Sequence, residues 1–146
     1  MLKELIIAFG IAAVCVVIHI NTLIILAGKL LDWRTKFDQL AGFTRYTLIL
    51  NMVFGIIIIL HLVETAIWAM AYLWWELFSD YETALYFSLT SYTTIGYGDV
   101  VLPERWRLLG GIEGISGVLL CGVSTAFIFV VLNDMHQVRR QKQGKA

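Results

Sequence analysis

The segment 93–99, Thr-Thr-Ile-Gly-Tyr-Gly-Asp, contains residue types suited to binding a dehydrated cation. Gly96 and Gly98 are separated by a single residue. Because glycine lacks a Cβ, these positions can adopt the alternating backbone angles that turn successive carbonyl oxygens to one side. A ring of such carbonyls can replace the water shell of K⁺. The side chains of Ile95 and Tyr97 would then point outward, where packing can hold the diameter of the ring.

One chain supplies one strand of such a ring, and a ring of four strands requires a homotetramer. Thr94 adds a hydroxyl oxygen at the inner end of the strand. The residues before it predict a short helix that ends near Thr93. The partial negative charge at the carboxyl-terminal end of this helix would face a cavity that holds the hydrated ion.

Three other ionisable residues, His61, Glu64 and Glu113, lie inside long apolar runs. The spacing of His61 and Glu64 places them on one face of a helix. Ionisable groups in apolar surroundings are costly and usually face protein or water. For the two carboxyls, a structural hydrogen bond and a proton-sensitive role near segment 93–99 both stay open. His19 and Asn21 are expected to be packing or interfacial groups.

The composition requires lipid around the chain. Of the 146 residues, 59% are hydrophobic and 15% are charged, and the mean hydropathy is +0.77. Soluble domains average about a quarter charged residues. A net charge of zero argues against nucleic acid as a partner. Cys15 and Cys121 have no His or Cys neighbours at metal-binding spacing, so neither a disulfide framework nor a zinc site is expected. The chain is expected to be an integral membrane protein.

Three apolar runs are long enough for membrane-spanning helices: 5–28, 46–75 and 108–133. A helix needs about 20 apolar residues to cross the hydrocarbon core. The first run could instead be a signal peptide, but the apolar core of a signal is only about 7–15 residues long. Segment 83–98 is too short to cross, which predicts a re-entrant helix and a non-helical return. The outer end of the second run carries the aromatic belt expected at headgroup level, namely Trp68, Tyr72, Trp74, Trp75 and Phe78.

Basic residues predict the orientation in the membrane. They lie in the first connection and in the carboxyl-terminal tail: Lys29, Arg34, Lys36, Arg45, Arg139, Arg140, Lys142 and Lys145. Because cytoplasmic loops carry an excess of Lys and Arg, we expect a multi-pass protein of the plasma membrane with its amino terminus outside. The expected organisation is an additional helix with its cytoplasmic connection (1–45), a pore domain (46–136) and a short basic cytoplasmic tail (137–146).

Segment 93–99 resembles the selectivity filter of the potassium channel superfamily, and we refer to it as the filter segment. The resemblance includes the preceding short helix, about 82–92, and the third apolar run. The pattern is similar to small bacterial channels of the two-transmembrane pore family, with one extra helix in front. It implies an all-α membrane protein with three transmembrane helices, a re-entrant pore helix and a filter loop. It also implies passive K⁺ conduction by a homotetramer, with K⁺ as the only ligand and no cofactor.

The resemblance implies that carbonyls of the filter segment coordinate K⁺: those of Thr94, Ile95, Gly96 and Tyr97, followed by Gly98. The Thr94 hydroxyl would complete the innermost site, and Asp99 would lie just behind the outer mouth. Four residues before Thr94, some members of the family have a glutamate that braces the filter through its aspartate. Here that position is Thr90, so what braces the filter is an open question.

The third run is expected to line an inner cavity. The family bends this helix at a glycine, and Gly117 is the expected position. The i, i+4 spacing predicts a stripe on one helical face, formed by Cys121, Thr125, Phe129 and Asn133. Either the stripe faces the pore axis, where Phe129 would narrow the inner mouth, or it packs against lipid or another helix.

Glu113 lies on the helix that packs behind the filter in this family. At that depth it could share a proton with Glu64. It could also accept hydrogen bonds from the pore helix, whose candidate donors are Ser88, Ser91 and Tyr92.

The sequence is also compatible with two alternatives to a potassium channel. One is a poorly selective cation channel, which Tyr97 disfavours, and the other is a non-conducting regulatory or lipid-binding subunit with a pore fold. A secondary transporter would show inverted repeats, and an enzyme would need a nucleophile, a base or a metal cluster; the sequence suggests neither. The expected partners are further copies of the chain and the lipid bilayer, with no nucleic acid and no small-molecule substrate. The gating stimulus is left open.

Overall fold

The computed structural model of the chain describes residues 2–37, 39–40 and 42–143. Within these ranges the chain forms four α-helices and one 3₁₀ turn. They are α1 (Leu2–Lys36), α2 (Gly42–Trp74), α3 (Tyr81–Tyr92), η1 (Glu104–Trp106) and α4 (Arg107–Gln143). The all-α class and the short helix expected at about 82–92 are confirmed.

The three long helices are long and apolar enough to span a membrane. Among the described residues, the candidate spans are Leu2–Leu30, Gly42–Trp74 and Glu104–Met135, which match the three predicted runs to within about one helical turn. Only 22–28% of the residues in their most apolar windows are buried within the chain. Most of the helical surface is therefore free to contact lipid or other copies of the chain.

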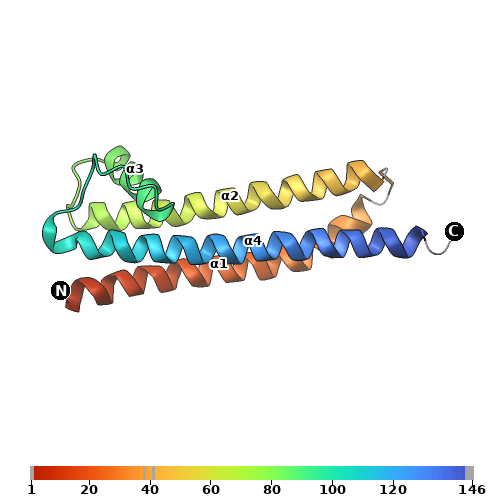
Figure 1. The fold of residues 1–146 in the computed structure, drawn as a ribbon, viewed down its shortest axis with the longest axis horizontal. Helices are drawn as coiled ribbons and strands as arrows, with labels where there is room; N and C mark the ends of the chain where they lie inside the picture. Colours follow the sequence, from red (N-terminus) through yellow and green to blue (C-terminus); the bar gives the residue numbers. More distant parts are fainter. Residues whose placement is uncertain (1, 38, 41, 144–146) are drawn as a thin grey trace.

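The arrangement of the helices separates two ends of the molecule. The start of α1 lies at the same end as α3 and the loop after it (Figure 1). The connection between α1 and α2 lies at the opposite end, together with the carboxyl-terminal part of α4 (Figure 1). The first helix packs along α4 and also contacts α2. An ion pair of 2.7 Å between Glu4 Oε1 and Arg105 Nε ties the start of α1 to η1.

The five aromatic residues expected to form a belt differ in burial, and Trp75 and Phe78 are half-buried. Trp74 is 83% exposed, as a belt residue should be, whereas Trp68 and Tyr72 are fully buried. The prediction that all five aromatics form an interfacial belt is therefore wrong for these two. Because α3 and α4 both pack against this part of α2, they enclose Trp68 and Tyr72 in the core, where Tyr72 packs edge-on against Phe87.

Local hydrogen bonds set the point where α3 begins. The chain leaves α2 through Glu76, whose φ of 53° lies in the left-handed region that usually favours glycine. Asp80 then caps α3, because its carboxylate accepts hydrogen bonds from the Thr83 N–H at 2.8 Å and from the Thr83 hydroxyl at 2.9 Å. These bonds hold the pKa of Asp80 below its usual value. The cap fixes the start of the helix that carries the filter segment at its other end.

Close contact with α4 sets the position of the other end of α3. A Cβ added at Gly114 would lie 3.1 Å from the Ser91 carbonyl oxygen, and one added at Gly117 would overlap the Tyr92 carbonyl oxygen. The structure shows α4 as one continuous helix from Arg107 to Gln143, in which Gly117 packs closely against the end of α3. The hinge role expected for Gly117 stays a prediction.

This contact predicts that Gly117→Ala destabilises the protein. The new methyl group would meet backbone at the end of α3, which cannot rotate away as a side chain could, so we expect a loss of about 1–3 kcal/mol per chain. The matched control is Gly55→Ala in α2, where an added Cβ meets nothing within 4 Å in the described part of the chain. Thermal melting in detergent should fall for Gly117→Ala and stay level or rise for the control. Equal melting of the two variants would contradict the close contact.

Candidate functional site

The filter segment has an unusual backbone. Its φ angles are positive at every second residue, with 59° at Thr94, 53° at Gly96 and 79° at Gly98. The sequence predicted such angles at the two glycines but not at Thr94. A positive φ is costly for a β-branched residue, and conformations of this kind cluster at functional sites.

Two backbone hydrogen bonds tie this strained segment to the end of α3. The Thr94 N–H donates to the Ser91 carbonyl, and the Gly96 N–H donates to the Thr90 carbonyl, both at 3.0 Å. Thr90 thus supports the filter segment through its backbone, while its hydroxyl donates to the Phe87 carbonyl at 3.0 Å within the helix. The shape of the segment therefore depends on where α3 is held.

Thr90 replaces the glutamate that braces the filter in some family members, and a different side chain makes a bond to Asp99 at the outer end of the filter segment. The Tyr86 hydroxyl donates a hydrogen bond of 2.7 Å to Asp99 Oδ2, which joins α3 to the last residue of the filter segment. This bond holds the pKa of Asp99 below its usual value. The sequence does not predict this role of Tyr86, because the contact spans 13 residues and joins a helix to a loop.

The side chains on either side of Gly96 are largely exposed in a single chain. Ile95 is 55% exposed and Tyr97 is 70% exposed. The sequence predicted that both would be packed against other groups. One chain leaves them open, so any packing that holds the diameter of a ring must come from another molecule.

Glu113 joins α3 to two other helices. Ser88 Oγ donates to Glu113 Oε1, and the Tyr72 hydroxyl donates to Glu113 Oε2, both at 2.5 Å and all fully buried. Ser88 Oγ also lies 2.8 Å from the carbonyl oxygen of Thr65. Ser88 is one of the three donors considered for Glu113. Tyr72 is among the residues expected at the interface, and its bond to Glu113 spans 41 residues, which no local spacing predicts.

Glu64 belongs to a separate buried group. It accepts a hydrogen bond of 2.5 Å from the Tyr92 hydroxyl at the end of α3, and its other oxygen lies 2.9 Å from His19 Nδ1. His61 Nδ1 lies 3.3 Å from Glu64 Oε2, as expected for neighbours on one helical face. His19 is fully buried, so the expectation of a simple packing or interfacial role misses its bond to Glu64. Asn21 is exposed and donates to the Val17 carbonyl of its own helix.

The inner half of α4 presents an uncovered stripe. Cys121, Thr125, Phe129 and Asn133 are all exposed in the single chain. Phe129 is 69% exposed, which is unusual for a large aromatic side chain unless lipid, a pore or another copy contacts it. Both interpretations of the stripe, pore lining and packing, fit this exposure.

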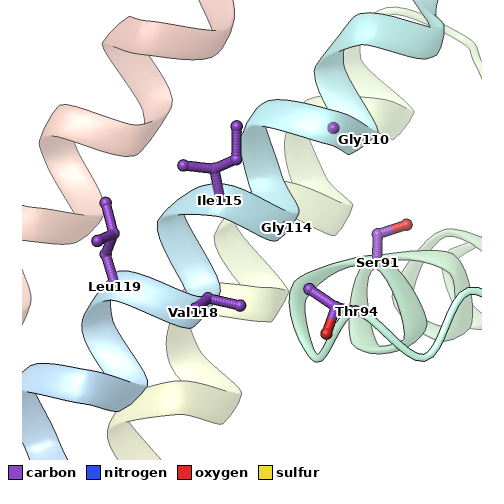
Figure 2. Close-up of a pocket in the computed structure, with 8 residues that line it drawn as sticks. Ser91, Thr94, Gly110, Gly114, Ile115, Val118 and Leu119 are labelled. Carbon is purple, nitrogen blue, oxygen red and sulfur yellow. The ribbon is translucent and has the colours of Figure 1, made fainter.

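A groove of about 420 Å³ runs between the end of α3 and the outer half of α4. Figure 2 shows Ser91 and Thr94 on one side and Gly110, Gly114 and Val118 on the other. The small residues on α4 keep the groove open. It borders Thr94, so a neighbouring molecule seated there would contact the inner end of the filter segment.

The bonds of Glu113 predict different effects for two substitutions. In Glu113→Gln the side-chain oxygen still accepts from the Tyr72 hydroxyl, and the amide N–H donates to Ser88 Oγ, whose hydrogen goes to the Thr65 carbonyl, so assembly and melting should change little. Glu113→Ala leaves the buried Tyr72 hydroxyl without its acceptor, and we expect a loss of about 1–3 kcal/mol per chain. Glu104→Ala is the control, since that side chain is 88% exposed. Wild-type melting of Glu113→Ala would show that this carboxyl does not hold α3.

Comparison with known proteins bears on the whole region from α2 to α4. A family model described as an ion channel matches residues 58–134, which is more than half of the chain. The calcium-gated potassium channel TvoK of Thermoplasma volcanium is 37% identical over 67 residues, covering 45% of this chain and 18% of that protein. The chain thus spans less than a fifth of the length of this relative. No solved structure matches the chain.

The family match includes the second half of α2, all of α3, the filter segment and most of α4. It follows that α3 occupies the pore-helix position of an ion-channel domain and that the chain is a multi-pass membrane protein. The chain belongs to the ion channel family.

Proposed function

We propose that the chain is one subunit of a potassium-selective channel that conducts K⁺ passively through a homotetrameric pore. The observation that carries the proposal is the filter backbone, where Thr94, Gly96 and Gly98 all have positive φ. Alternation of this kind allows consecutive carbonyl oxygens to turn toward one axis. A member of the ion channel family moves ions without covalent chemistry, so the protein is not an enzyme.

In this proposal K⁺ exchanges its water shell for carbonyl oxygens. The coordinating residues are Thr94, Ile95, Gly96 and Tyr97. Several adjacent sites of moderate affinity let one ion displace the next, so that binding does not block conduction. The Thr94 hydroxyl donates to the Thr93 carbonyl at 2.7 Å in the single chain, and it would turn to complete the innermost site in the tetramer.

The uncovered surfaces support a homotetramer. One filter segment cannot surround an ion, and the exposed side chains of Ile95 and Tyr97 need another chain to pack against. The groove beside Thr94 offers a neighbouring copy a surface next to the filter. Four copies around one axis would satisfy the ion and the uncovered side chains together.

The separation of the two ends supports an orientation with the filter outside. The basic residues Lys29, Lys36 and Arg45 lie around the connection between α1 and α2, at the end away from the filter segment (Figure 1). By the excess of such residues on the cytoplasmic side, that end faces the cytoplasm and the start of α1 faces outward. In the same proposal, Thr125 and Phe129 line the inner cavity.

Potassium selectivity is also supported by the relative from Thermoplasma volcanium, whose name describes a potassium channel. The matched part is 18% of that protein. Calcium gating of the relative is therefore not carried over to this chain, and the proposal concerns conduction alone.

The test is ion flux from liposomes that contain the purified protein, with K⁺ and Na⁺ compared. Wild type should pass K⁺ and largely exclude Na⁺. Tyr97→Asp removes the outward anchor and should widen the ring, raising the Na⁺-to-K⁺ permeability ratio roughly tenfold, the change produced by about 1.4 kcal/mol. Tyr81→Asp is the control, since Tyr81 is exposed at the far end of α3.

Each outcome of this test has a clear meaning. Equal K⁺ and Na⁺ flux through wild type would favour the poorly selective channel. Absence of flux from correctly inserted protein would favour the non-conducting subunit. An unchanged ratio in Tyr97→Asp would contradict the role of Tyr97 in holding the ring.

A further inference from the structure

A closed ring of hydrogen bonds lies behind the end of α3. Its five members come from the four α-helices: His19 on α1, His61 and Glu64 on α2, Tyr92 on α3 and Ser124 on α4. His61 is 19% exposed, and the other four side chains are buried.

The contacts can be followed around the ring. His19 Nδ1 lies 2.9 Å from Glu64 Oε1, and His19 Nε2 lies 3.0 Å from Ser124 Oγ. Ser124 Oγ lies 3.2 Å from His61 Nε2, and His61 Nδ1 lies 2.9 Å from the Tyr92 oxygen. The Tyr92 hydroxyl donates to Glu64 Oε2 at 2.5 Å, which closes the ring.

Counting hydrogens shows what the ring requires. Each of its five contacts needs one hydrogen between two heavy atoms. An ionised Glu64 supplies none, whereas Tyr92, Ser124 and two neutral imidazoles supply one each, which makes four. A fully bonded ring must therefore hold one proton more than the ordinary neutral-pH forms of these side chains provide.

The fifth proton has two placements that leave every contact bonded. In the first placement Glu64 is ionised, and the Nδ1 atoms of His19 and His61 donate to Glu64 and Tyr92. Ser124 then lies between the two Nε2 atoms and can donate to only one of them. The other Nε2 must carry a hydrogen of its own, so one imidazole is doubly protonated. If Glu64 is protonated, all five donors point the same way around the ring. Both forms have no net charge, as an apolar environment favours.

We propose that this ring is a binding site for one proton, and that the bound proton fastens the end of α3 to α1, α2 and α4. Loss of the proton leaves a net negative charge in apolar surroundings. It also leaves Ser124 Oγ with one hydrogen for two Nε2 lone pairs, so one contact opens. Tyr92 directly precedes the filter segment, so the proton acts where the filter is held. Only the consequence for ion flow depends on the proposed function.

A metal ion fits this geometry less well than a proton. Ligand atoms of His19, His61 and Glu64 lie within 4.8 Å of one another. Each of these side chains already lies within hydrogen-bond distance of the next member of the ring, so a metal would have to break contacts that a proton completes.

Other titratable groups lie near the ring. Cys15 on α1 precedes His19 by one turn, and Cys121 Sγ on α4 lies 4.0 Å from His61 Nε2. Thiols are ordinarily uncharged at neutral pH. Glu113 on α4 is bonded to Tyr72 and Ser88. The ring is therefore the group expected to bind the proton.

The test compares the stability of full-length variants between about pH 6 and pH 9, a range that spans the ordinary titration of histidine. Ser124→Ala removes the atom that joins the two imidazoles. The three contacts that are left need three hydrogens, which neutral His19, neutral His61 and Tyr92 supply. An additional proton therefore completes no hydrogen bond in this variant and is held less tightly than in wild type. The matched control is Ser116→Ala on the same helix, where the hydroxyl donates to the Glu113 carbonyl outside the ring.

Wild type should lose stability relative to Ser124→Ala as pH rises through the range in which only the folded wild type holds the additional proton. The ratio of their folding constants should fall about tenfold per pH unit for each chain until the ring loses its proton. The unfolded states of the two proteins bind the same number of protons, so their contributions cancel in the ratio of folding constants. The stability of Ser116→Ala should change with pH in parallel with that of wild type.

Glu64→Gln provides a second and independent variant. Its amide N–H supplies the fifth hydrogen, so the ring stays closed at every pH and the variant should gain stability relative to wild type as pH rises. This comparison decides the question even if Ser124→Ala does not fold. The proposal would be overturned if the stability of Glu64→Gln changed with pH in parallel with that of wild type. So would a fall in wild-type melting on adding a metal chelator, since that would show a bound metal.

Discussion

Thr94 has a φ of 59°, a conformation that costs a residue of its type about 1–3 kcal/mol, so the filter segment keeps its shape only while neighbouring structure holds it. Its two backbone anchors, the carbonyls of Thr90 and Ser91, belong to the last turn of α3. The geometry of the candidate ion site therefore depends on the position of one short helix. Much of the rest of the fold acts by fixing that helix.

Two buried carboxyl groups provide the fixed points. Glu113 takes hydrogen bonds from Ser88 and Tyr72, and Glu64 takes one from Tyr92. A polar group left unpaired in an apolar medium costs several kcal/mol, so a shift of α3 away from these acceptors is strongly opposed. The additional helix α1 takes part directly, since His19 contacts Glu64 and Ser124, and Glu4 pairs with Arg105 after the filter segment. The first helix is thus part of the support of the pore domain.

The spans, the short helix and the filter segment could be predicted from the sequence because each depends on local pattern: apolar length, a run too short to cross, and glycines at alternate positions. The support of the filter could be predicted only in part: the depth of Glu113 indicated a bond to a pore-helix donor, and Ser88 makes it, but the other partners were not predictable. Tyr86 reaches Asp99, and Tyr72 reaches Glu113 across 41 residues, through contacts that no local spacing encodes. His19 looked like a packing residue because its partner lies on another helix, 45 residues away. The close contact of Gly117 with the Tyr92 carbonyl could not be predicted either, because it depends on how α3 packs against α4.

The central claim is that the filter segments of several chains, held by their pore helices, form the ion site. The most direct measurement is an electron cryomicroscopy map of the purified protein in K⁺. The account predicts four chains around one axis, with density for dehydrated ions between the carbonyl oxygens of residues 94–97. It also predicts the Tyr86–Asp99 and Ser88–Glu113 bonds behind each filter. A well-resolved map in K⁺ in which the filter segments do not meet at an axis, or in which their carbonyls turn away from it, would contradict the account.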